Sequence, residues 1–210
     1  MGIAPEPQLH RIGVFGGTFD PIHVGHLIAA RAAQAAYGLD RIVFVTAGSP
    51  WQKADYSDPE DRFMMSVLAA ASDPCFTASR VELDRRGPTY SIETLELLRS
   101  WHGPGVDLFF IGGVDAIANI ATWHRALEVG EVASVIAVAR SGHLFDEVPE
   151  LPGGPRIFAL PVDPVDVSST EIRRRVAAGE SIDGMVPPGV AGYIEARGLY
   201  RDPAGGGPAR

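Results

Sequence analysis

The sequence predicts an α/β protein built on a doubly wound parallel sheet, in a single domain with a helical part towards the C-terminus. Five short runs are almost wholly apolar and rich in β-branched and aromatic residues, which is typical of strands covered on both faces. Helical patterns alternate with these runs. Strands that alternate with helices form right-handed crossovers in a parallel sheet, and its ligands bind beyond the carboxyl ends of the strands.

The expected elements follow from these patterns in chain order. The apolar runs IGVF, RIVFVTA, DLFFIGG, ASVIAVA and RIFAL predict strands at 12–15, 41–47, 107–113, 133–139 and 156–160, and 76–83 is a further candidate. The intervening patterns predict helices over 24–37, 59–71, 92–101 and 116–128. The proline- and glycine-containing ends, 1–9 and 202–210, are expected to be disordered, with the folded domain at 10–201 and a surface loop at 140–155.

Composition and charge restrict the class of protein. Of the 210 residues, 46% are hydrophobic and 21% are charged, as in ordinary globular chains. The formal net charge of −8, from 18 Lys+Arg and 26 Asp+Glu, argues against a nucleic-acid partner. No signal-peptide pattern and no membrane-spanning apolar run is visible, so we expect a cytoplasmic location without a membrane partner. The single Cys75 cannot form an internal disulfide, which fits a reducing compartment.

The segment Gly16–Leu27, GGTFDPIHVGHL, predicts a strand–loop–helix that holds nucleotide phosphates. Its two leading glycines follow an expected strand and let the backbone turn tightly beside a ligand. The helix begins near His23 or Val24, and a helix N-terminus presents unpaired N–H groups and a positive dipole end. His23 and His26 share one face of the first turn. Gly25, between them, removes a side chain where something large must come close.

Other interpretations of this segment are weaker. It matches neither GxGxxG nor the lysine-bearing P-loop. A zinc site could use two histidines, but HExxH spacing is absent, no cysteine lies nearby and no third ligand is evident. An ordinary helix with satisfied histidines would explain either histidine alone, whereas the pair after a Gly–Gly strand end favours phosphate binding.

A second motif, SSTEIR at Ser168–Arg173, predicts another anion site. Its three leading hydroxyl groups can cap the helix that begins there, and the helix N-terminus can bind phosphate. Arg173 lies one turn beyond Thr170, so its guanidinium can reach a phosphate held at that N-terminus. The alternative is an ordinary capped helix with solvated arginines, which we prefer for Arg174 and Arg175.

GGTFDPIHVGHL resembles the HxGH signature of the nucleotidylyltransferase superfamily, and SSTEIR resembles the second signature of that superfamily, which contacts the triphosphate. The resemblance implies a Rossmann-like nucleotidyltransferase fold and transfer of a nucleotidyl group from ATP or CTP. A mononucleotide phosphate that attacks the α-phosphorus is already ionised, so no general base is required. Alignment and stabilisation of negative charge then suffice. We expect one Mg²⁺ on the ATP phosphates and no metal cage made by the protein.

Three features point to the acceptor of the nucleotidyl group. Gly87–Ser91, GPTYS, is a turn whose N–H groups could bind a carboxylate, although a Ser-capped helix without a ligand is the plain alternative. Asp115 follows the strand at 107–113 and can accept a hydrogen bond from a ribose hydroxyl. Trp123 could stack on a flat heteroaromatic ring, although a single Trp is more often a packing residue.

Together these motifs resemble the bacterial nicotinate-nucleotide adenylyltransferases, which convert nicotinate mononucleotide and ATP into deamido-NAD and pyrophosphate. The similarity includes DRFMMSVLA from Asp61 and the closing VPPGVAGYIEARGLY from Val186, both of which have ordinary core explanations. The resemblance implies that the catalytic residues are His23, His26, Lys53 and Arg173. It implies ATP contacts from Gly16, Gly17, Thr18, His23, His26, Gly112, Asp115, Ser168, Ser169, Thr170 and Arg173. It implies nicotinate mononucleotide contacts from Thr18, Lys53, Thr89, Tyr90 and Trp123.

One departure and several alternatives remain. Family members often carry Pro-Pro-His-Lys where this chain has SPWQK at Ser49–Lys53, so Trp51 and Gln52 replace the usual pair, and Trp51 suits a lid or a subunit contact. The alternatives are an adenylyltransferase for nicotinamide mononucleotide or phosphopantetheine, and a nucleotide sensor without catalysis. GPTY with Trp123 suits a flat acidic ring, and the retained histidines, Lys53 and Arg173 argue against a sensor. The oligomeric state, a homo-oligomer included, stays open.

Overall fold

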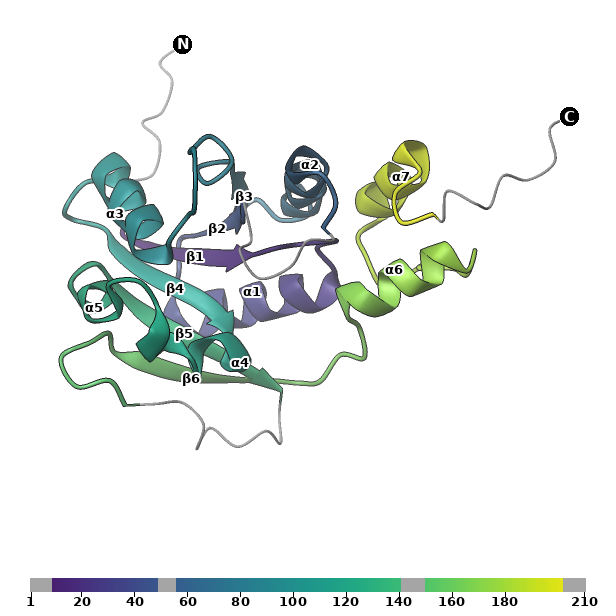
Figure 1. Cartoon of the computed structure of the whole chain (residues 1–210). Coiled ribbons are helices and arrows are strands. Elements are labelled where there is room, and N and C mark those ends of the chain that lie inside the picture. The colour runs from purple at the N-terminus through teal and green to yellow at the C-terminus, as the bar shows by residue number, and fades with distance from the viewer. Residues whose placement is uncertain (1–8, 49–55, 141–149, 202–210) are drawn as a thin grey trace, which may run out of the picture. The chain divides into compact units, whose positions relative to one another are not determined.

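The computed structural model describes residues 9–48, 56–140 and 150–201 (Figure 1). The predictions for Trp51, Gln52 and Lys53 fall outside these ranges, as do those for 1–8, 141–149 and 202–210. The chain divides into two compact units, and the single domain at 10–201 stays a prediction. The first unit comprises Met1–Gly16, Ala30–Val43 and Tyr90–Val162, and the second comprises Gly17–Ala29, Phe44–Thr89 and Asp163–Arg210.

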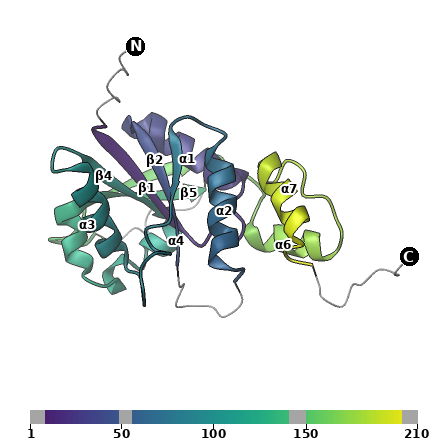
Figure 2. The same ribbon diagram turned by 90° about the horizontal axis from the view of Figure 1, so that it is seen from above.

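Six strands form a sheet of order β3-β2-β1-β4-β5-β6 (Figures 1 and 2). Strands β1, β4, β5 and β6 pair in parallel, with Val14 opposite Phe110, Phe110 opposite Val135 and Val135 opposite Ile157. The order reverses direction between β1 and β4, as in doubly wound sheets, so the predicted fold class is confirmed. The strand bounds are β1 Arg11–Gly17, β2 Arg41–Thr46, β3 Phe76–Ser79, β4 Asp107–Gly113, β5 Ala133–Arg140 and β6 Ile157–Val162.

Helices connect the strands and complete the C-terminal part. Their bounds are α1 Val24–Tyr37, α2 Pro59–Ala70, α3 Ser91–His102, α4 Val114–Ile117, α5 Val129–Val132, α6 Ser169–Ala177 and α7 Pro188–Arg197. Helix α1 has the predicted bounds, α2 ends one residue before its predicted end, and α3 extends one residue beyond its predicted range at each end. Within the second unit, α6 and α7 lie side by side and form the predicted helical part (Figures 1 and 2).

The central residues of the strands in the first unit are buried, and their side chains are apolar. Ile12 and Val14 of β1, Ile111 of β4, and Val135 and Ile136 of β5 are at most 1% exposed. Such side chains have no polar atoms to satisfy, and their burial supplies the main favourable term in folding. The near-continuous apolar runs of the sequence therefore mark the core of this unit.

The two edge strands differ from their predictions. Strand β6 was expected to be covered on both faces, but Leu160 is its one buried residue, because an edge strand has a neighbour on one side only. Pro161, opposite Ala139, has no N–H to donate, which an edge strand tolerates. Strand β3 ends before Arg80, whose carbonyl accepts the N–H of Asp84 at 3.0 Å in a turn, so it covers only half of the candidate range 76–83.

The predicted helix over 116–128 is wrong. The chain forms the short α4 and then two 3₁₀ turns, Ile120–Thr122 and Ala126–Glu128. The Asn119 side-chain amide donates to the Asp115 carbonyl (3.0 Å), and the Thr122 hydroxyl donates to the Asn119 carbonyl (2.8 Å). Such local bonds compete with the helical ladder for carbonyl groups. Arg125 then adopts a left-handed backbone with φ of 53°, which no helix continues.

The tight packing around β1 gives a stability prediction. A Cβ atom added to Gly13 would lie 2.7 to 2.9 Å from side-chain carbons of Ile42, Ile111 and Leu39. We expect Gly13→Ala to lower the free energy of unfolding by about 1–3 kcal/mol, because overpacking forces neighbouring side chains out of position. Gly105→Ala is the matched control, since nothing lies within 4 Å of its added Cβ. Urea denaturation measures both, and equal stability of the two variants would refute the packing argument.

Candidate active site

The loop at 18–23, between β1 and α1, is held by one of its own aromatic rings. Phe19 has a left-handed backbone with φ of 52°, and its side chain is 3% exposed. Its ring packs edge-on against the rings of His26 (5.1 Å between centroids) and Phe44 (5.8 Å). A Cβ on Gly17 would lie 2.7 Å from the Phe19 ring, so Phe19 occupies the space that the sequence assigned to a ligand. Burial of this ring offsets the left-handed backbone, which costs about 1–2 kcal/mol.

The two histidines form a stacked pair at the start of α1. Their ring centroids lie 3.8 Å apart, with the ring planes 27° from parallel. The backbone N–H of His23 donates to Nδ1 of His26 at 3.2 Å, so that nitrogen carries no proton. Burial, with the neighbouring His23 as the second cause, lowers the pKa of His26 well below 6.5. His26 is therefore a neutral imidazole whose proton sits on Nε2.

The first turn of α1 has fewer open amides than a helix start usually offers. The N–H of Val24 donates to the Met185 carbonyl (3.0 Å), and the N–H groups of the two residues after Gly25 donate to the His23 carbonyl (3.0 and 3.4 Å). In the described part of the chain, Gly25 is the residue of this turn whose amide finds no protein partner. A Cβ on Gly25 would lie 3.1 Å from the His23 ring and 3.2 Å from Val167. The large groups that approach Gly25 thus include the protein's own side chains.

The second motif begins α6 as predicted, and its hydroxyl groups have distinct tasks. The Ser168 hydroxyl caps the helix by accepting the N–H of Glu171 at 3.1 Å. The Ser169 hydroxyl donates to the carbonyl of Pro21 at 2.9 Å, which joins the two motifs. The backbone N–H groups of Ser169 and Thr170 find no partner among the described residues. These two amides can be offered to an anion, whereas the hydroxyl proton of Ser169 is already donated to Pro21.

Arg173 forms the second link between the motifs. Its guanidinium donates to the carbonyl of Asp20 at 2.7 Å and to the hydroxyl of Thr170 at 3.5 Å. Residues that are 153 positions apart in the sequence are thereby in direct contact. The predicted proximity of GGTFDPIHVGHL and SSTEIR is present in the structure, and the part of each residue in binding or catalysis stays a prediction.

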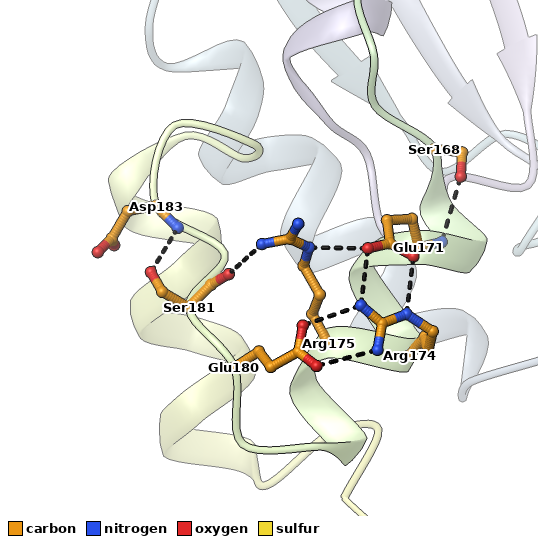
Figure 3. A network of polar contacts seen from close by, with 7 residues as sticks. All are labelled: Ser168, Glu171, Arg174, Arg175, Glu180, Ser181 and Asp183. Carbon is orange, nitrogen blue, oxygen red and sulfur yellow. Dashed lines mark hydrogen bonds and ion pairs between the residues drawn. The ribbon is translucent and has the colours of Figure 1, made fainter.

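Arg174 and Arg175 point into an ion-pair network with Glu171 and Glu180 (Figure 3). Both guanidinium groups bind Glu171 at 2.8 Å, and Arg174 also binds Glu180 at 2.8 Å. These hydrogen bonds lower the pKa of Glu171 to about 2, so it stays ionised near neutral pH. The two arginines are solvent-exposed as predicted, and they are also neutralised by carboxylates.

The first unit holds the residues predicted for the acceptor ring. Tyr90 precedes α3 without a side-chain cap, so the Ser-capped helix weighed from the sequence is not formed. The Tyr90 ring stacks on His124 with centroids 4.3 Å apart. Trp123 is half-buried, and its ring meets Phe110 edge-on at 5.2 Å. The structure thus brings Tyr90 beside the segment that carries Trp123, although α3 and that segment are distant in sequence.

The remaining predicted residues have varied surroundings. The Thr89 hydroxyl donates to the Glu82 carboxylate at 2.8 Å. Asp115 is exposed in the first turn of α4. A Cβ on Gly112 would lie 3.1 Å from Ile117, and one on Gly16 would lie 3.2 Å from Phe110, so both glycines permit close packing. The Thr18 carbonyl accepts a hydrogen bond from Arg62 at 2.9 Å.

Two searches of the described residues bear on metals and membranes. No group of three or more His, Cys, Asp or Glu side chains there is arranged to hold a metal ion. His23 and His26 therefore lack the third ligand that a zinc site needs, within the part of the chain that the structure describes. No described helix is both long enough and apolar enough to cross a bilayer.

Sequence reasoning missed a polar cluster at the loop at 18–23, made of the buried Arg62 and Asp20 and the half-buried Tyr200. Arg62 is 1% exposed and Asp20 is 2% exposed, and Tyr200 donates its hydroxyl to Asp20 at 2.7 Å. Arg62 and Tyr200 lie in the two segments that the sequence explained as ordinary core. A signal was available: Arg62 precedes the buried Met65 and Ser66 by three and four residues, so it falls on the core-facing stripe of α2.

Comparison with known proteins identifies the protein family and the fold. The family model described as cytidylyltransferase-like matches residues 14–175. A solved nicotinic acid mononucleotide adenylyltransferase from Plasmodium falciparum shares the fold, with a TM-score of 0.73 at 19% identity, over 91% of this chain and 97% of that one.

Proteins of similar sequence identify the branch of this family to which the chain belongs. A protein of Acidothermus cellulolyticus is 48% identical over 93% of this chain and 97% of its own, and one of Thermus thermophilus is 49% identical over 91% and 100%. Both are named probable nicotinate-nucleotide adenylyltransferase. The chain therefore belongs to the cytidylyltransferase-like family, in the branch of the nicotinate-nucleotide adenylyltransferases.

The surroundings of His26 give a prediction about pH. Because the folded state holds His26 neutral and the unfolded chain takes up a proton near pH 6.5, the stability contributed by this group is full above that pH and falls as the pH is lowered through it. The Cε1–H NMR signal of His26 should show no titration step near pH 6.5 in the folded protein. The same signal should titrate there in urea-unfolded chain. A step near pH 6.5 in the folded state would refute the assignment.

Proposed function

We propose that this chain transfers the adenylyl group of ATP to nicotinate mononucleotide, giving deamido-NAD and pyrophosphate as a step of NAD synthesis. The observation that carries the proposal is the contact between the two motifs, in which Ser169 and Arg173 bind the loop that leads to His23 and His26. The relatives at 48% and 49% identity bear the name of this activity, and a fold neighbour was solved in complex with NaAD. ATP and nicotinate mononucleotide are accordingly the proposed partners.

We call the loop at 18–23, the first turn of α1 and the start of α6 the phosphate-binding half. This half has to stabilise charge and align the reactants. An oxygen of the mononucleotide phosphate bonds to the α-phosphorus of ATP, and the bond from that phosphorus to pyrophosphate breaks. Arg173 supplies a full positive charge, the amides of Gly25, Ser169 and Thr170 supply N–H groups, and neutral His26 supplies the Nε2 proton. Fixed donors of this kind stabilise the charge that develops on the transferring and leaving groups.

Two further contributors to this half are proposed from the family resemblance. Lys53 is proposed to reach a phosphate. Mg²⁺ is proposed to enter with ATP and to neutralise its phosphate oxygens. The donor set of the phosphate half fits a metal that arrives on the nucleotide, because arginine, backbone amides and a protonated Nε2 bind phosphate oxygens directly and do not ligate Mg²⁺.

Residues just before α3 and beyond β4 carry the proposed acceptor contacts. The Thr89 and Tyr90 amides are proposed to bind the nicotinate carboxylate, and Trp123 is proposed to offer a flat face for the pyridine ring. Gly112 and Asp115 are proposed to contact the ATP ribose. A carboxylate accepts from N–H groups with both oxygens, whereas the NH₂ of a carboxamide would point its own protons at those donors.

This acceptor geometry predicts a preference for the acid. With nicotinamide mononucleotide in place of nicotinate mononucleotide, kcat/KM should fall about 10- to 100-fold, the equivalent of one charge-assisted hydrogen bond. Pyrophosphate release with ATP and Mg²⁺ measures both acceptors, with phosphopantetheine as a third. Equal kcat/KM for the acid and the amide would refute the preference, and no release with any acceptor would favour a non-catalytic sensor.

The three consecutive arginines of α6 allow a matched mutational test. Arg173→Ala should lower kcat about 100-fold, because it removes a cation expected to act on the transferring phosphate. Arg174→Ala, which removes the same side chain from the ion-pair network with Glu171 and Glu180, should leave kcat nearly unchanged. Steady-state pyrophosphate release measures the two variants at saturating substrate. Similar losses in both would show that charge on α6, rather than the position of Arg173, matters.

A further inference from the structure

A buried arginine of α2 ties together the segments that surround the phosphate loop at 18–23. The Arg62 side chain is 1% exposed, and within the part of the chain that the structure describes its guanidinium donates to four backbone carbonyls. The acceptors are Thr18 (2.9 Å), Ala47 (2.7 Å), Gly48 (3.4 Å) and Ser57 (3.1 Å). A rigid fork of five N–H groups can bridge several strand and loop ends at once, which few other side chains can do.

Asp20 balances this arginine from within the loop itself. Its side chain is 2% exposed, Oδ1 accepts the hydroxyl of Tyr200 at 2.7 Å, and Oδ2 accepts the N–H of Ser57 at 3.3 Å. Burial lowers the pKa of Arg62, and the charge of Asp20 opposes that effect. Burial, and then the adjacent carboxylate, raise the pKa of Tyr200, so its phenol remains a hydrogen-bond donor.

The loop that Arg62 and Tyr200 fix is also the loop that binds α6 through hydrogen bonds. Asp20 presents its carbonyl to Arg173 at 2.7 Å, while its carboxylate is fixed by Tyr200. The next carbonyl along the chain, that of Pro21, accepts from Ser169. A shift of the Asp20 side chain would therefore move the atoms that position Arg173 and the loop that leads into His23.

Tyr200 is brought to Asp20 by the way in which α7 ends. Helix α7 is anchored to α2 because Asp61 accepts the Tyr193 hydroxyl at 2.7 Å and the Arg197 side chain at 3.0 Å. Gly198 closes the helix in a left-handed conformation. Tyr200 is itself left-handed, with φ of 63°, a conformation that non-glycine residues adopt rarely and that clusters at functional sites.

We propose that Tyr200 is a positioning residue for adenylyl transfer, acting through Asp20 on Arg173 and His23, with Arg62 as the fixed support on the other side of the loop. The proposal rests on the proposed function, and Tyr200 itself touches no reacting atom. The closing segment of the fold is thereby part of the phosphate-binding half rather than a packing element.

Tyr200→Phe tests this proposal because it deletes one hydroxyl and keeps the ring. Tyr193→Phe is a closely matched control: it deletes a tyrosine hydroxyl that also donates to a buried carboxylate at 2.7 Å, but among the described residues no hydrogen bond joins Asp61 to the loop at 18–23. Both variants should lose similar amounts of stability. Only Tyr200→Phe should lower kcat, by about 10- to 100-fold, since small misplacements of catalytic groups cost that much, with KM for nicotinate mononucleotide unchanged.

A readout without substrate separates failure of this proposal from failure of the proposed function. The NMR ring signals of His23 and His26 should shift in Tyr200→Phe and stay in place in Tyr193→Phe. If the wild-type chain released no pyrophosphate, the proposed function would fail, and these shifts would still test the coupling. Unmoved histidine signals in Tyr200→Phe, or equal kcat losses in the two variants, would overturn the positioning role.

Discussion

The phosphate-binding half depends on one constraint: the loop at 18–23 has to satisfy backbone carbonyls that are not part of a strand or helix. The carbonyls of Thr18, Asp20 and Pro21 are taken by Arg62, Arg173 and Ser169. An unsatisfied buried carbonyl costs about 1–3 kcal/mol, so these bonds fix the loop strongly. Because two of the three donors belong to α6, the same bonds bring the second motif to the first. The hydrogen bonds that satisfy the loop carbonyls therefore also bring the two motifs together.

A histidine side chain likewise satisfies a backbone group at the start of α1. A backbone N–H at the start of α1 is satisfied by Nδ1 of His26, which leaves the ring proton on Nε2. Two stacked imidazoles could not both be cations at 3.8 Å without strong repulsion, and burial favours the neutral form further. The pair therefore brings no second full cation to the start of α1. Arg62 and Arg173 are the full positive charges that contact the loop at 18–23.

Patterns of apolar residues predicted most of the fold, and ordered motifs predicted which segments meet. Helix α1 and strand β4 have their predicted bounds because their signals are local: a Gly–Gly strand end and an unbroken apolar run. The helix expected at 116–128 failed because side-chain bonds from Asn119 and Thr122 override apolar spacing. The network around Arg62 was missed for another reason. Its acceptors are backbone carbonyls, which every residue has, so no residue pattern identifies them.

The acidic balance of the chain also takes on a physical meaning. Eighteen basic residues against 26 acidic ones would repel a triphosphate unless positive charge is kept apart from carboxylates. Around α6 and α7, Arg174 and Arg175 are paired with Glu171, and Arg197 is paired with Asp61. Arg173 differs: among the described residues its hydrogen bonds go to a carbonyl and a hydroxyl, which carry no net charge. The ion pairs neutralise the neighbouring arginines, whereas the described hydrogen bonds of Arg173 do not neutralise it. Under the proposed function, the charge of Arg173 is the one that acts on the nucleotide. Of the three consecutive arginines of α6, Arg173 is thus the one that contacts the loop at 18–23 and is not neutralised by a described ion pair.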